Sequence, residues 1–121
     1  MKFLMIHRIN EAVSFPADTA GEEDPTEAKE LDAWVAEMEA NGVKLHGGRL
    51  QPTWHARTVR MKDGEVLVGE VLPGDGPFAE TKEQIAGFDV IECASMDEAI
   101  EIASRHPTAR IGTFELRPFW E

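Results

Sequence analysis

Cysteine and long hydrophobic runs are both scarce in this chain, and their scarcity limits the cellular compartments in which the protein is expected. The single cysteine, Cys93, excludes an internal disulfide bond and a metal cage of several thiolates. The apolar run near the N-terminus covers only Phe3 to Ile6, which is too short for a signal peptide, and no stretch approaches membrane-spanning length. We therefore expect a cytoplasmic protein in a reducing compartment.

Basic residues are also few. The chain has 12 lysines and arginines against 23 aspartates and glutamates, which gives a formal net charge of −11. A chain with this charge repels a phosphate backbone, and no basic cluster reverses the repulsion locally. Nucleic acid is therefore not an expected partner.

Several motifs that carry chemistry are missing. The four histidines lack the short spacing of zinc ligands, and the acidic residues show no calcium-loop pattern. The sequence has no glycine-rich phosphate loop, and no serine stands in a nucleophile-elbow context. Cys93 falls within a predicted strand, on the side that faces the helices. We expect no metal, no nucleotide cofactor and no covalent catalysis.

The composition that remains is that of an ordinary globular protein, with 42% hydrophobic and 29% charged residues. A length of 121 residues fits one domain, residues 1–121. Periodicity and turn signals predict strands at 2–9, 43–52, 86–94 and 110–120, a hairpin at 56–72 that turns at 62–64, and two helices. The segment 10–24 is interpreted as a long loop that can act as a lid, and a bulge is expected at Gly47-Gly48.

Both predicted helices have clear ends. The first begins with Asp24 as N-cap and Pro25 at its first position, and it ends at Gly42. The second begins at Ser95, which forms a capping box with Glu98, and it ends at Pro107. The expected apolar stripes are Ala28, Leu31, Trp34, Val35 and Met38 in the first helix and Ala99, Ile100 and Ala103 in the second.

Without the hairpin the order of elements is βαββαβ, which predicts an α+β, ferredoxin-like fold with two helices on one face of an antiparallel sheet. Alternation in the first strand is interpreted with Leu4 and Ile6 facing the helices and His7 on the open face. The open face is further expected to carry Phe3, Met5, Phe88, Val90, Glu92, Glu115, Arg117 and Phe119. Because so many of these are apolar, we predict a homodimer whose two sheets face each other around a partly polar cavity.

Three segments resemble the DGPF branch of the YCII-related family: Asp75–Phe88, Ser95–Pro107 and Phe114–Trp120. The first contains the letters that name the branch, and the resemblance covers nearly the whole chain. It implies a dimeric α+β barrel with a pocket that holds a His–Asp pair. Some relatives of the wider family act on chlorinated aromatic or lactone substrates, and other DGPF members are encoded beside or fused to alternative sigma factors. Here Gly69–Gly74 separates the hairpin from the signature, unlike in most members.

The candidate catalytic residues are Asp75, His106 and His7. Asp75 serves either as a turn acceptor or as the carboxylate that orients a histidine. His106 either satisfies the carbonyl groups at the end of the second helix as a cation or, as the resemblance implies, pairs with Asp75. His7 lies either at the dimer seam or beside the predicted cavity.

The candidate substrate-binding residues are Arg117, Lys82 and Glu80. Arg117 either clamps a substrate carboxylate or forms a structural ion pair with Glu115 or Glu92. Glu80 and Lys82 belong either to a solvated surface or to the rim of the pocket, where Lys82 favours an anion.

Two functions fit these residues. The first is a cofactor-free acid–base enzyme that acts on a small carboxylate, lactone or aromatic compound. The second is a non-catalytic dimer that binds a small molecule or has a regulatory role, and that is linked to an alternative sigma factor.

Overall fold

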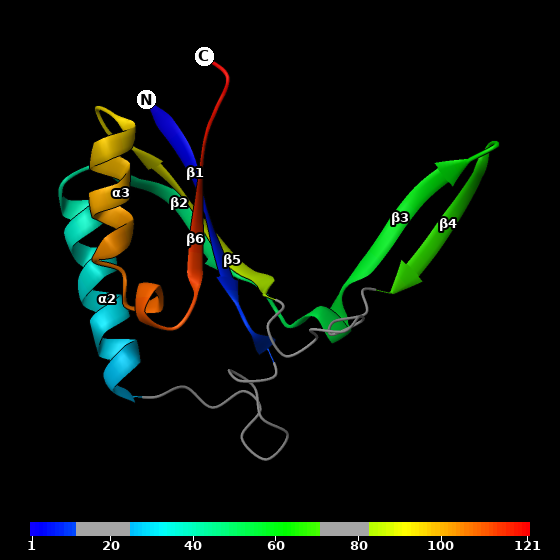
Figure 1. Cartoon of the computed structure of the whole chain (residues 1–121), viewed down its shortest axis with the longest axis horizontal. Coiled ribbons are helices and arrows are strands. Elements are labelled where there is room, and N and C mark those ends of the chain that lie inside the picture. The colour runs from blue at the N-terminus through cyan, green and yellow to red at the C-terminus, as the bar shows by residue number, and fades with distance from the viewer. Residues whose placement is uncertain (12–24, 71–82) are drawn as a thin grey trace.

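The computed structural model describes residues 1–11, 25–70 and 83–121 of the chain (Figure 1). The elements in chain order are strand β1 (Lys2–Ile9), helix α2 (Pro25–Ala40), strands β2 (Lys44–Arg49), β3 (Arg57–Lys62), β4 (Glu65–Glu70) and β5 (Gln84–Glu92), helix α3 (Met96–Ser104) and strand β6 (Thr113–Pro118). The described ranges also contain the short 3₁₀ helices η1 (Thr53–His55) and η3 (Pro107–Arg110). Without β3 and β4 the order is βαββαβ, as the sequence predicts.

The main sheet has the strand order β2-β5-β1-β6, and every neighbouring pair is antiparallel. Both helices cover the same face of this sheet (Figure 1). The architecture is therefore α+β and compatible with a ferredoxin-like fold. None of the helices in the described ranges is long and apolar enough to cross a membrane.

Local signals in the sequence explain where the elements turn or end. Gly42 follows α2 with φ of +69°, a left-handed conformation that glycine adopts without strain. At the start of α3, the Ser95 hydroxyl accepts a hydrogen bond from the Glu98 backbone N–H at 3.2 Å. The hairpin turns at Asp63 and Gly64, both with positive φ, as in the turns that suit a two-residue hairpin loop.

The predicted faces of the first strand are inverted in the structure. Phe3 and Met5 are completely buried against the helices, and His7 lies on the same side. Every residue from Phe3 to Ile6 is apolar, so the alternation along the strand fits either face equally well. The core consists of Phe3, Met5, Trp34, Met38, Ile91, Ala99, Ile102 and Ala103.

Smaller corrections concern the ends and surfaces of elements. Leu31 and Ile100 are exposed rather than buried, and Ile102 takes the core position of α3. The irregularity in β2 falls between Lys44 and His46, so the bulge predicted at Gly47-Gly48 is displaced toward Leu45. Helix α3 ends at Ser104, and the last strand begins only at Thr113, because η3 occupies the residues between them.

The hairpin β3–β4 forms a separate two-stranded sheet that projects from the rest of the chain (Figure 1). The homodimer with facing sheets stays a prediction. Its expected interface changes, however, because Phe3 and Met5 belong to the core and Leu4 and Ile6 lie on the face away from the helices. On that face Leu4 pairs with Arg117 and Ile6 pairs with Glu115 of β6.

Candidate functional site

The centre of the candidate site is a hydrogen-bonded pair, His7 of β1 and Asp89 of β5. His7 Nε2 lies 2.7 Å from Asp89 Oδ2. The two side chains are only 13% and 7% exposed, so little solvent screens the pair. A buried carboxylate that accepts from one imidazole nitrogen fixes the ring orientation and leaves the other nitrogen available to act as a base.

Strand pairing explains why these two residues meet. Residue Met5 of β1 lies opposite Asp89, and His7 lies opposite Gly87, so His7 and Asp89 are diagonal neighbours on the face covered by the helices. On the other side of β5, Gly47 of β2 is paired with Asp89. A Cβ atom at Gly47 would overlap Asp89 Oδ1, so the absence of a side chain there makes room for the carboxylate.

A positive charge accompanies the carboxylate. Lys44 Nζ lies 3.9 Å from Asp89 Oδ1 and 3.8 Å from Glu39 Oε1. The lysine side chain is 16% exposed, so its charge is partly shielded from solvent. Asp89 thus lies between an imidazole and an ammonium group, one at each carboxylate oxygen.

His106 reaches the same site from the end of α3. Because the next residue is Pro107, His106 is forced out of the helical conformation and adopts φ of −72° and ψ of 135°. It then serves as N-cap of η3, and its Nδ1 accepts a hydrogen bond from the Thr108 backbone N–H at 3.0 Å. The Ser-Arg-His-Pro sequence therefore ends one helix and aims the imidazole inward.

His106 is buried among aromatic rings. Its side chain is buried, with the residue 3% exposed, and its ring makes edge contacts with those of His7, Trp34 and Phe114 at centroid distances of 4.7 to 5.0 Å. Burial, together with the charge of His7, lowers the pKa of His106 to about 4, although Asp89 opposes the shift. His106 is therefore neutral at physiological pH. The expected role as a cation for the end of the helix is wrong.

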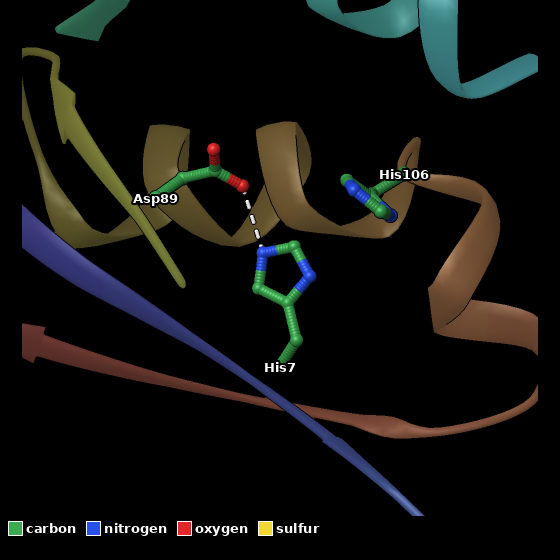
Figure 2. A group of neighbouring side chains, drawn as sticks. All are labelled: His7, Asp89 and His106. Atoms are coloured by element: carbon green, nitrogen blue, oxygen red, sulfur yellow. Dashed lines mark hydrogen bonds and ion pairs between the residues drawn. The ribbon is translucent and has the colours of Figure 1, made fainter. Parts of the chain in front are cut away.

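The neutral ring has a defined tautomer. Since Nδ1 accepts from Thr108, its lone pair is occupied and the ring proton belongs on Nε2. This Nε2–H is buried and has no hydrogen-bond partner among the described residues. Figure 2 shows how the three side chains converge, with Asp89 from β5, His7 from β1 and His106 from the segment after α3.

A groove on the outer side of His106 runs between α2 and the end of α3. Its lining includes Trp34, Arg105, His106, Pro107 and Arg110. Two ion pairs cross it, because Arg105 binds Glu37 at 3.0 Å and Arg110 binds Glu30. These pairs tie the segment that carries His106 to α2.

The structure brings together some of the residues predicted from the sequence and separates others. His7 and His106 are neighbours, whereas Arg117 lies on the opposite face of the sheet, where it binds Glu115. The expectation that His7 and Arg117 share the open face is therefore wrong. Asp75, Glu80 and Lys82 lie outside the described residues, and so does the pairing of Asp75 with His106.

Asp89 is the site residue that the sequence analysis missed. Its signal was an acidic residue inside an otherwise apolar strand, Gly87 to Ile91, two positions before a core isoleucine on the same face. A buried carboxylate in such a strand requires a partner, and His7 supplies it.

The cluster also has the donor set of a metal site. One ligand atom each from His7, Asp89 and His106 lies within 4.8 Å of the others. Two histidines and a carboxylate are a common set for divalent transition metals, and spacing along the sequence gave no hint of it. However, a histidine ligand usually donates its second ring N–H, whereas Nδ1 of His106 accepts a hydrogen bond. A metal on Nε2 would require the ring to lose its only proton, so the donor set fits poorly.

Fold and site together define a small α+β domain with a buried His–Asp pair beneath its helices. The sequence matches the YCII-related domain over residues 1–121, so the chain belongs to the YCII-related family. It is also 41% identical over 99 residues to an uncharacterised protein of Rhizobium meliloti (strain 1021), a match that covers 80% of this chain and 76% of the relative.

Replacement of Gly47 by alanine tests the space beside Asp89. In Gly47→Ala the new methyl group overlaps the carboxylate, so we expect a loss of about 1–3 kcal/mol in the free energy of unfolding. The matched control is Gly48→Ala, whose Cβ would meet nothing closer than Phe88 at 3.9 Å. Urea unfolding of both variants makes the comparison, and equal stabilities would contradict this account of Gly47.

The lowered pKa of His106 predicts a particular dependence of stability on pH. Between the ordinary pKa of 6.5 and the folded-state pKa of about 4, the unfolded chain binds a proton that the folded chain does not. Stability therefore falls as pH is lowered through this window, by at most about 3 kcal/mol from this group and less where solvent reaches the ring. His106→Phe should remove this part of the pH dependence. The control is the exposed His55, and His55→Gln should keep the wild-type profile in urea unfolding between pH 4 and 7.

Proposed function

We propose that this protein is an acid–base catalyst that moves a proton on a small lactone, aromatic or carboxylate compound. The observation that carries the proposal is the 2.7 Å hydrogen bond between His7 and Asp89, which is almost completely shielded from solvent. Such a pair is the arrangement that orients an imidazole for proton transfer. The assignment to the DGPF branch is part of this proposal and rests on the letters at Asp75–Phe78.

The roles of the two residues follow from the hydrogen bond. His7 donates its Nε2–H to Asp89 Oδ2, so the lone pair of Nδ1 is the base. When Nδ1 takes a proton, the ring becomes an imidazolium ion whose charge is stabilised by the Asp89 carboxylate. Lys44 limits the negative charge at the other carboxylate oxygen. Proton transfer of this kind contributes roughly 10²–10⁴-fold to a rate, enough for an acidic C–H bond or an activated lactone.

The alternative is a protein that binds the same class of molecule without turnover, in a regulatory role. It makes no use of a free imidazole base, since binding needs only shape and hydrogen bonds. For this reason the two functions separate on one measurement, the transfer of protons to or from a bound compound.

The test is deuterium exchange, which detects proton transfer without knowledge of the complete reaction. Ketones, lactones and phenols are incubated with the protein in D₂O, and loss of their exchangeable C–H signals is followed by ¹H NMR. We expect wild type to accelerate exchange in at least one compound. His7→Gln should lower that rate by about 10²-fold or more, because the base is lost.

Asp89→Asn and His55→Gln complete the series. Asp89→Asn keeps the size of the side chain but removes the charge that stabilises the imidazolium ion, so its rate should fall as well. His55 is exposed in η1, and His55→Gln should exchange as wild type does. Equal rates for wild type and His7→Gln, or no exchange across the panel, would reject catalysis by His7 and favour the binding role.

A further inference from the structure

The buried Nε2–H of His106 is a hydrogen-bond donor that the proposed base does not use. Among the described residues it has no acceptor, although its own ring is packed against His7, Trp34 and Phe114. A buried donor without an acceptor costs about 1–3 kcal/mol, so proteins seldom keep one that has no use. Pro107 and the 3₁₀ helix η3 hold this donor in place.

The donor lies close enough to the His7–Asp89 pair to act on the same molecule. The rings of His7 and His106 are 4.7 Å apart at their centroids and nearly perpendicular. One ligand atom from each of the three side chains falls within 4.8 Å of the others, and Figure 2 shows the three on one side of the sheet. A molecule that accepts a hydrogen bond from Nε2 of His106 at about 2.6–3.2 Å would therefore also lie beside the His7 ring.

We propose that His106 donates its Nε2–H to a carbonyl oxygen of the substrate, and that the site therefore takes an uncharged ketone or lactone with an acidic C–H beside the carbonyl. This inference rests on the proposed acid–base function and restricts its substrates to uncharged carbonyl compounds, which leaves out the carboxylates. It replaces the ion clamp expected from the sequence with a neutral donor.

The proton-transfer step balances with these groups alone. Nδ1 of His7 takes the proton from the carbon next to the carbonyl, and the electrons of that C–H bond form a carbon–carbon double bond. The carbonyl π electrons move onto oxygen, which becomes an enolate that accepts the hydrogen bond from His106. Return of the proton from His7 to carbon, at the same or the neighbouring position, restores the base.

Charge explains why the substrate is uncharged before reaction. His106 is neutral, and Lys44 lies between two carboxylates, Asp89 and Glu39, so these described groups carry no net positive charge that would attract an anion. A neutral imidazole gives no Coulombic attraction to a ready-made anion, but it stabilises an oxyanion that develops in the transition state. A neutral imidazole that caps a helix start and polarises a carbonyl is known from an isomerase with another fold.

The experiment compares His106→Phe and His106→Gln in the deuterium-exchange assay with cyclic ketones and lactones. Phenylalanine keeps an aromatic ring and removes the donor, so we expect the exchange rate at saturating substrate to fall by about 10²-fold with little change in KM. Glutamine offers an amide N–H and should restore part of the rate. A His106→Phe rate equal to that of wild type would overturn the proposal, as would an equal loss in both variants.

A second measurement needs no substrate. Long-range ¹H–¹⁵N NMR of the imidazoles distinguishes protonated from bare ring nitrogens, and we expect His106 to carry its proton on Nε2 from pH 5 to 8. A proton on Nδ1, or an imidazolium ion at neutral pH, would overturn the proposal. Stoichiometric binding of Zn²⁺, measured by calorimetry and abolished in His106→Phe, would also overturn the proposal. In that case Nε2 of His106 would supply a lone pair to the metal and could not carry a proton. Failure of the proposed function is detected separately, by a deuterium-exchange rate in His7→Gln that equals the wild-type rate.

Discussion

The hydrogen bond between His7 and Asp89 is the interaction on which the rest of the site depends. It joins the two central strands of the sheet on the face that the helices cover, where an unpaired carboxylate would be costly. Two features of strand β2 accommodate it. Gly47 leaves space for the carboxylate, and Lys44 supplies a counter-charge. The sheet order that makes the fold ferredoxin-like is therefore also the order that assembles the site.

His106 is positioned by local backbone constraints rather than by strand pairing. Pro107 forces His106 into an extended conformation, and the first free N–H groups of η3 fix its tautomer through Thr108. Burial among three aromatic rings then keeps it neutral. The two imidazoles thus differ in role although they are neighbours. His7 has a carboxylate partner and a second ring nitrogen that can take up a proton, whereas His106 accepts from Thr108 at Nδ1 and has only the Nε2–H to offer to a ligand.

Much of the fold could be predicted from local patterns. The turn at Asp63-Gly64, the Ser95 cap and the glycine after α2 each have a local physical cause, and the order of elements followed from them. The faces of β1 could not be predicted, because an uninterrupted apolar run has no polar side to mark the solvent. The pairing of His7 with Asp89 could not be predicted either. His7 and Asp89 are 82 residues apart, and only the strand register brings them together.

The central claim is that Asp89 holds the proton of His7 on Nε2 and leaves Nδ1 free as the base. The measurement that tests it most directly is the tautomer of His7, read from the ¹⁵N shifts of its two ring nitrogens in wild type and in Asp89→Leu. The account predicts a protonated Nε2 and a bare Nδ1 in the neutral ring of wild type, with loss of this single tautomer in Asp89→Leu. A proton on Nδ1 in wild type, or the same tautomer without the carboxylate, would contradict it.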